Sequence, residues 1–201
     1  MVSLASFAYA NINVAPENFE KAGKQYVFID VLKADYKITY DTDNSRAQAR
    51  STLKFYLPQK GRALFDLRED IAEAKLNGLN VEIKQVDMPN NKAIRVIDKQ
   101  LTKGNYGLTL EHSFSKNTII RSDNVKSAFW MSDLSERTYL EQYLPINMEY
   151  DQIKMNIEVK IEGTSKNHIL KTNGEIKKLG LNHFKVSYPK TYTASSIYYH
   201  L

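Results

Sequence analysis

The sequence has no cysteine and no long apolar run, and each absence excludes a class of protein. Without cysteine, the chain of 201 residues has no disulfide, no thiolate nucleophile and no cysteine-ligated zinc site. Because no run of about 18 apolar residues occurs, we predict that no segment spans a membrane. The hydrophobic content of 42% and the charged content of 25% are those of an ordinary globular protein, which excludes wholesale disorder.

Local motifs for metal or nucleotide chemistry are also missing. None of the four histidines belongs to a His-Glu-x-x-His motif, and the eight glycines match no phosphate-binding or dinucleotide-binding spacing. The acidic run that begins at Asp41 resembles the start of a calcium loop, but Arg46 and Thr52 stand where that loop needs glycine and glutamate. We therefore predict no catalytic residue, no metal ligand and no cofactor in this chain.

The net charge of +5 raises the question of a nucleic-acid partner. Basic and acidic residues are interleaved along most of the chain, as in the segment 154–162. The densest basic cluster consists of Lys171, Lys177, Lys178 and Lys185. A solvated strand face accounts for that cluster better than a phosphate-binding stripe, so we exclude nucleic acid as a partner.

Alternation of apolar and polar residues dominates the sequence. It is clearest over 153–162, where five apolar residues alternate with five polar ones, as expected of a strand with one buried face. Turn-forming residues separate this run from the others, which favours an all-β fold, an antiparallel β-sandwich or saddle. The further strand-like runs are 26–33, 36–40, 53–57, 63–67, 81–86, 93–98, 106–110, 168–171, 184–188 and 195–201.

Helical periodicity is scarce, and we expect only one or two short helical turns. The candidates are 16–22, which Pro16 would open, and 135–143, which Ser135 would cap. We divide the chain into an N-terminal extension, 1–25, and one β-domain, 26–201. Within that domain the polar stretch 115–126 is expected to join two halves of the sheet structure.

The first ten residues are uncharged and end in Ala8-Tyr9-Ala10, the pattern found at the end of a secretory signal. They lack the basic start and the longer apolar run of a complete signal. Two interpretations remain open. If these residues are the remainder of a signal, the protein is periplasmic or secreted, and otherwise they are the N-terminal extension of a cytoplasmic protein.

Two segments combine aromatic residues with irregular or edge positions, which marks them as contact surfaces. The segment 133–143 carries acidic residues and the rings of Tyr139 and Tyr143. Its carboxylates suit general acid–base catalysis, but a capped helical turn explains them better. The terminal strand 195–201 carries Tyr198 and Tyr199 and needs a partner at its edge. We predict a docking surface formed by these four tyrosines.

Several segments, in this order and spacing, resemble the N-terminal β-domain of the aminopeptidase N-like zinc metallopeptidases. The resemblance covers roughly residues 30–201. The segments that carry it are the strands 35–41 and 49–55, the turn Leu76-Asn77-Gly78 with 80–83, the strand 101–108, the proline-containing stretch 139–155, and the closing His200-Leu201.

This resemblance implies that zinc and the catalytic residues belong to a catalytic domain outside these residues, which is the expected partner in the same polypeptide. It also implies that Asp133, after the small Ser132, contacts the amino end of a substrate. The family pattern is altered around it, with Glu136-Arg137 and Tyr143-Leu144-Pro145 in place of the family's residues.

Two functional hypotheses follow. In the first, the chain is a non-catalytic N-terminal domain that supports the catalytic domain of a zinc metallopeptidase and lines its substrate cleft. The alternative is a stand-alone exported β-sandwich module that binds a peptide or a glycan through exposed tyrosines. An autonomous hydrolase has no motif in its favour.

Overall fold

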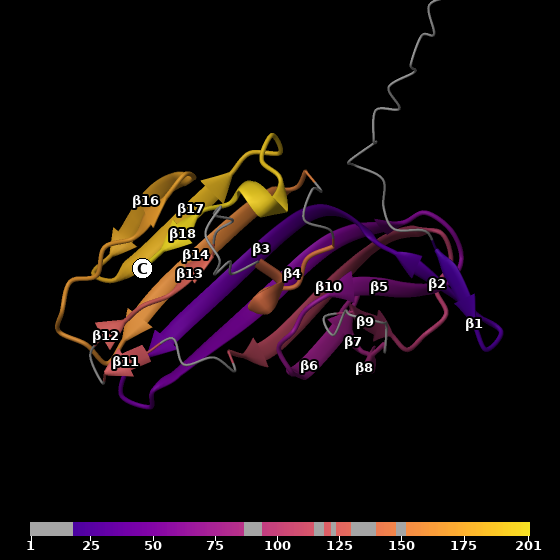
Figure 1. The fold of residues 1–201 in the computed structure, drawn as a ribbon, viewed down its shortest axis with the longest axis horizontal. Coiled ribbons are helices and arrows are strands. Elements are labelled where there is room, and N and C mark those ends of the chain that lie inside the picture. The colour runs from indigo at the N-terminus through magenta and orange to yellow at the C-terminus, as the bar shows by residue number, and fades with distance from the viewer. Residues whose placement is uncertain (1–17, 87–93, 115–118, 122–123, 130–139, 148–151) are drawn as a thin grey trace, which may run out of the picture.

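The computed structural model describes residues 18–86, 94–114, 119–121, 124–129, 140–147 and 152–201 (Figure 1). A large mixed sheet runs along the long axis of the molecule, and a second sheet lies at one end of it. The strands of the large sheet are, in spatial order, β16 (Glu175–Gly180), β17 (His183–Tyr188), β14 (Lys154–Glu162), β3 (Asp30–Asp41), β4 (Arg46–Leu57), β10 (Gly104–Ser113), β6 (Ile71–Leu76) and β7 (Leu79–Asn80).

The remaining strands form three smaller sheets. The five-stranded sheet has the order β1 (Phe19–Lys21), β2 (Lys24–Phe28), β5 (Arg62–Asp66), β9 (Ile94–Ile97) and β8 (Ile83–Gln85). The three-stranded sheet has the order β13 (Ala128–Phe129), β18 (Tyr199–His200) and β15 (Lys171–Thr172), and β11 (Ile119–Arg121) pairs with β12 (Asn124–Val125). Two short 3-10 helices are present among the described residues, η1 (Leu140–Gln142) and η2 (Ala194–Ser196).

The strict alternation of the long strands produces a two-faced sheet. In β14 the apolar residues of the run 153–161 are buried and the residues between them are half-buried or exposed. β3 and β4 alternate in the same way, with Tyr36, Tyr40 and Phe55 among the largest fully buried side chains. The apolar face therefore needs a cover. The five-stranded sheet, the three-stranded sheet and the segment 140–147 contribute residues to the same buried cluster.

The predicted all-β, sandwich-like fold is confirmed, but its strands are not all antiparallel. β14 runs parallel to β3, and β2 runs parallel to β5. Alternation shows which side chains share a face, and it is the same whichever way a strand runs, so it does not reveal strand direction.

The helical turn expected at 16–22 is wrong where the structure describes it, because β1 and β2 form a hairpin there. Ala22 and Gly23 make its turn with positive φ angles of 52° and 69°. Phe19 stacks on Tyr26 with ring centroids 5.0 Å apart. The pairing begins at Phe19, within the stretch assigned to an N-terminal extension. In the second candidate, 135–143, η1 occupies the described part.

Two of the weaker predicted strands are much shorter in the structure. Within 168–171 only Lys171 is in a strand, and within 195–201 only Tyr199–His200 is, next to η2. In the polar stretch 115–126 the described residues include the short pair β11 and β12.

One buried arginine fixes the connection between the five-stranded and eight-stranded sheets. Arg95, on β9, is 9% exposed, and its Nε donates a hydrogen bond to the carbonyl of Leu67 at 2.9 Å. Its Nη2 donates to the carbonyls of Arg68 and Glu69 at 3.2 and 3.0 Å. A planar guanidinium can reach three successive carbonyls in this way, whereas a lysine ammonium cannot hold the same geometry.

We therefore expect Arg95→Lys to lower the free energy of unfolding by about 2–4 kcal/mol, because buried carbonyls lose charge-assisted hydrogen bonds. Urea denaturation of the purified chain measures the change. Arg50→Lys is the matched control: Arg50 forms an exposed ion pair with Glu111, and its replacement should change stability by less than about 1 kcal/mol. Equal effects of the two substitutions would contradict the structural role assigned to Arg95.

Candidate functional site

The described part of the predicted contact segment 133–143 is 140–143, which begins with η1 and continues as an irregular stretch to Asn147. Leu140, Leu144 and Ile146 are buried in the main core. The amides of Tyr143 and Leu144 both donate to the carbonyl of Leu140, at 3.0 and 2.9 Å, which closes the short helical turn. The segment is thus part of the packed structure, although it contains only one turn of regular structure.

Backbone hydrogen bonds attach this segment to the five-stranded sheet and to the loop after β5. Asp66 and Ile146 exchange two bonds: the Asp66 amide donates to Ile146 at 2.7 Å, and the Ile146 amide donates back at 3.0 Å. The Arg68 amide donates to the carbonyl of Glu141 at 2.9 Å. The loop that Arg95 holds therefore also supports the segment 140–147.

Buried side chains of the eight-stranded sheet bind the same segment from the other side. The Tyr36 hydroxyl donates to the carbonyl of Pro145 at 2.6 Å, and Nε2 of His112 lies 2.6 Å from the carbonyl of Tyr143. A carbonyl can only accept, so Nε2 carries a proton and donates it to this bond. Asn147 completes the attachment by donating its side-chain amide to the carbonyl of Ile29.

Burial keeps these groups uncharged near neutral pH. It raises the pKa of Tyr36, with a smaller contribution from the charge of Asp35. It lowers the pKa of His112 below its ordinary value, although the bond to the Tyr143 carbonyl acts in the opposite direction. A neutral phenol and a neutral imidazole can position a carbonyl without placing an unpaired charge in the core.

The predicted site residues differ in whether the structure describes them and in how deeply they are buried. Asp133 and Tyr139 lie outside the described residues. Tyr143 and Tyr199 are only 6% and 0% exposed, so they are core residues and cannot present their rings to a partner in this conformation. Tyr198 is half-buried, and its amide donates to Oδ1 of Asn173 at 2.9 Å. Of the predicted docking surface, only Tyr198 is described with its ring partly accessible.

Burial of the two tyrosines has a local cause in each case. Tyr143 packs against Phe114 with ring centroids 4.9 Å apart. Tyr199 lies on the central strand of the three-stranded sheet, where burial, together with the nearby Tyr40, raises its pKa well above the ordinary value. The sequence pattern predicts no metal-binding role for the four histidines, and His112 is not among the predicted site residues. The alternation over 108–112 could have identified it, because that pattern places His112 on the same face of the strand as the buried apolar residues.

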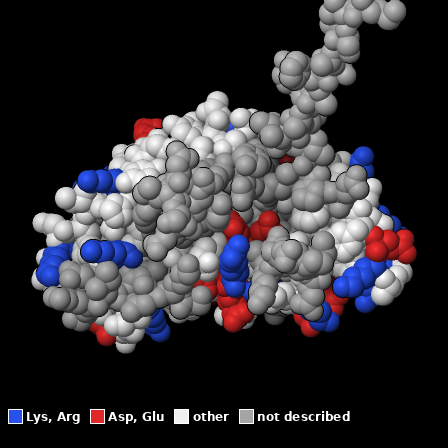
Figure 2. Space-filling model, in the orientation of Figure 1, with Lys and Arg blue, Asp and Glu red and all other residues white. Residues whose placement is uncertain are grey.

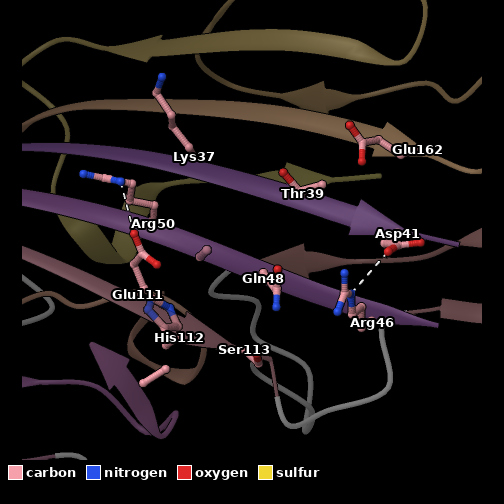
Figure 3. Close-up of a pocket in the computed structure, with 12 residues that line it drawn as sticks. Lys37, Thr39, Asp41, Arg46, Gln48, Arg50, Glu111, His112, Ser113 and Glu162 are labelled. Carbon is pink, nitrogen blue, oxygen red and sulfur yellow. Dashed lines mark hydrogen bonds and ion pairs between the residues drawn. The ribbon is translucent and has the colours of Figure 1, made fainter. Parts of the chain in front are cut away.

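A shallow hollow of about 350 Å³ lies on the polar face of the large sheet (Figure 3). Its charged side chains form ion pairs, with Arg50 3.1 Å from Glu111 and Arg46 3.2 Å from Asp41. Both pairs are exposed side-chain contacts between neighbouring strands. This arrangement offers a balanced polar surface, and we assign no catalytic role to it.

Within the parts of the chain that the structure describes, no three His, Asp or Glu side chains are grouped so that they could hold a metal ion. Those parts also contain no helix long and apolar enough to cross a membrane. On the face shown in Figure 2, described basic and acidic side chains both occur around the rim and in the middle, as the interleaved sequence predicts.

No protein-family model matches the sequence, and no curated protein has a significantly similar sequence. Solved structures do match the fold. An M1 zinc metallopeptidase from Deinococcus radiodurans superposes with a TM-score of 0.60 at 15% identity over 88% of this chain. A mutant of that enzyme bound to a Tyr-Ser-Ala substrate gives 0.59 over 86%, also at 15% identity. Leukotriene A4 hydrolase from Saccharomyces cerevisiae gives 0.58 at 13% identity over 86%.

These matches cover most of this chain but only part of the enzymes. The chain spans 42% of the length of the Deinococcus metallopeptidase, in both structures, and 28% of the yeast hydrolase. The expected resemblance to the β-domain of zinc metallopeptidases is thus confirmed for the fold. At such low identity the likeness carries no residue-level information about activity.

The buried His112 generates a prediction about pH. The neutral imidazole contributes stability above the ordinary pKa of 6.5, and this contribution is lost as the pH falls through the lowered pKa of the folded state. We expect His112→Phe to destabilise the chain by about 1–3 kcal/mol near neutral pH, because the Tyr143 carbonyl loses its donor. The difference from the unsubstituted chain should shrink as the pH falls from about 7 to about 5.

Urea denaturation at a series of pH values tests this expectation. His200→Phe, at an exposed position of β18, serves as the control for the substitution itself and should change the free energy of unfolding at neutral pH by less than about 1 kcal/mol. A destabilisation by His112→Phe that stays constant over this pH range would show that the histidine is not held neutral in the folded state.

Proposed function

We propose that this chain is the non-catalytic N-terminal domain of an aminopeptidase-like zinc metallopeptidase, that it supports the catalytic domain, and that it lines the substrate cleft. The observation that carries the proposal is the match of 86–88% of the chain to enzymes of which it spans less than half. A domain that accounts for 28–42% of such an enzyme leaves the larger part of the polypeptide for the chemistry.

The construction of the segment 140–147 supports a positioning role. It is bound on one side by the backbone of Asp66 and Arg68 and on the other by buried Tyr36 and His112. A residue that contacts a substrate must be held in place by supporting groups that do not themselves move. Asp133, which the family resemblance assigns to the substrate's amino end, lies shortly before this anchored segment in the sequence.

The proposed substrate class is a peptide with a free amino terminus. A carboxylate such as that of Asp133 would pair with the substrate's ammonium group by a charge-assisted hydrogen bond. The Deinococcus metallopeptidase mutant was solved with a Tyr-Ser-Ala peptide, which is a ligand of this class.

Zinc does not fit the described residues of this chain. They offer no grouped ligands, and the sequence contains no cysteine. We therefore place the zinc ion and all bond-breaking steps in the catalytic domain, and we assign this chain binding and support only. The alternative of a tyrosine-based binding module gains little support, because the described tyrosines are all buried or half-buried.

The proposal predicts that the natural reading frame encodes a His-Glu-x-x-His motif downstream of Leu201, since that motif places two zinc ligands on one helix face. Sequencing of the gene beyond Leu201 checks this directly. We also expect the purified 201-residue chain to hydrolyse no aminoacyl substrate, with or without added zinc. A stop codon after Leu201, or zinc-dependent peptidase activity from the chain alone, would contradict the proposal.

A second prediction concerns Asp133 in the complete enzyme. Asp133→Asn should raise the KM for a peptide with a free amino terminus by about tenfold or more, because the ammonium loses its charged partner. Steady-state kinetics measures the change, with Asp43→Asn, in the exposed turn after β3, as the control. An unchanged KM would show that Asp133 does not contact the substrate. The supporting role of the domain would then be tested by the reading frame alone.

A further inference from the structure

The polar face of the eight-stranded sheet is divided into two halves that differ in charge pairing. In the half that contains the hollow of Figure 3, cations lie beside acids of the same face. Lys37 is 3.8 Å from Glu158, and Arg50 is 3.1 Å from Glu111. Lys160 pairs with Glu162 in the same way. Exposed pairs of this kind contribute little stability, but they leave no excess of either charge.

The other half contains an open cleft of about 630 Å³ where β3, β14, β16 and β17 lie side by side. Three lysines line it, Lys33 of β3, Lys154 of β14 and Lys185 of β17, together with one acid, Glu175 of β16. The cleft therefore has an excess of positive charge that the other half of the same face lacks.

Cross-strand pairing in this half places like charges opposite one another. Lys154 is the register partner of Lys33, and Lys185 has Lys177 as its register partner on one side and Glu158 on the other. Like charges directly opposite in a sheet destabilise it. Among the residues that the structure describes, Lys154, Lys177 and Lys185 have no acidic side chain within ion-pair distance.

The acid beside Lys33 is already engaged. Asp35 lies 2.5 Å from Nζ of Lys33 and accepts a hydrogen bond of 2.6 Å from the side chain of Asn156. Burial acts to raise the pKa of Asp35, but these two bonds and the charges of Lys33 and Lys185 outweigh it and lower the pKa. Asp35 is thus ionised and neutralises only one of the three lysines that line the cleft.

The wall of the cleft is formed without a ligand. The Tyr192 hydroxyl donates to the carbonyl of Asn173 at 3.1 Å, and the side chain of Asn173 donates to the carbonyl of Ser196 at 2.7 Å. Next to Asn173, a Cβ on Gly174 would lie 2.6 Å from a methyl group of Val186. The turn is thus tightly packed against β17, and a ligand would meet a well-packed wall with lysine side chains around it.

From the cleft and its uncompensated lysines, we propose that this site binds a small multivalent anion that carries phosphate groups. A lysine ammonium is a flexible point charge suited to phosphate oxygens, and several can converge on one multivalent anion. Such an anion would offset the repulsion between Lys33 and Lys154, which both line the cleft, whereas a single carboxylate carries too little charge to do so. This site is separate from the proposed role in a metallopeptidase and does not depend on it.

Isothermal titration calorimetry of the full chain with inorganic tripolyphosphate at low ionic strength tests the proposal. We expect saturable binding that weakens at least about tenfold in Lys154→Gln/Lys185→Gln, because two charge-assisted contacts are lost. The matched control is Lys75→Gln/Lys160→Gln, which removes the same charge from the same sheet face and should stay within about twofold.

Thermal unfolding without the anion shows whether the variants still fold, so that a loss of binding is not mistaken for misfolding. The Lys154→Gln/Lys185→Gln variant should unfold at the same temperature as the unsubstituted chain or higher, because it has less repulsion, and tripolyphosphate should no longer raise that temperature. No binding to the unsubstituted chain, equal weakening in both double variants, or equally tight binding of citrate would overturn the proposal.

Discussion

The apolar face of the eight-stranded sheet is the constraint on which the rest of the structure depends. Strict alternation in β3, β4, β10 and β14 gives that sheet one face that must be removed from water. Residues of the five-stranded sheet, the three-stranded sheet and the segment 140–147 all enter the same core cluster. The smaller elements are too short to be stable by themselves, and their shared contact with this face holds them together.

The polar groups buried beneath that cover determine where the irregular segment lies. Apolar contacts are non-directional, whereas the bonds from Tyr36 and His112 to two carbonyls of 140–147 are directional. Arg95 acts similarly on the loop 67–69, which in turn binds Glu141 through Arg68. A segment built in this way is a rigid base for residues before it in the sequence, and this links the fold to the proposed positioning role.

The two halves of the opposite, polar face of the eight-stranded sheet differ in how their charges are paired. Exposed charges add little to stability when they are paired, so the balanced half of that face is explained by solubility alone. Unpaired lysines placed opposite each other are harder to explain in that way, because they oppose the pairing of their own strands. A strand lysine is therefore part of a solvated face where an acid pairs with it, and part of a candidate anion site where lysines from several strands converge without such a partner.

The sequence by itself determined the strands and the general class of fold. The run 153–162 and its counterparts in β3, β4 and β10 became two-faced strands because side chains alternate along any extended chain. The order of these segments was also sufficient to show the resemblance that the fold comparison confirms. These features are local, or they depend only on order along the chain, so no knowledge of spatial neighbours is needed to find them.

Only the tertiary structure decided which strands are neighbours, which of them run parallel, and which aromatic or basic residues are available. The pairing of β14 with β3 joins residues 121 positions apart, as in the bond between Asn156 and Asp35. Tyr143 and Tyr199 became core residues, and Lys33 came to lie beside Lys154, through contacts of the same long range. Such contacts depend on how distant segments share one buried face, and a periodic pattern specifies the face of a residue but not its partner.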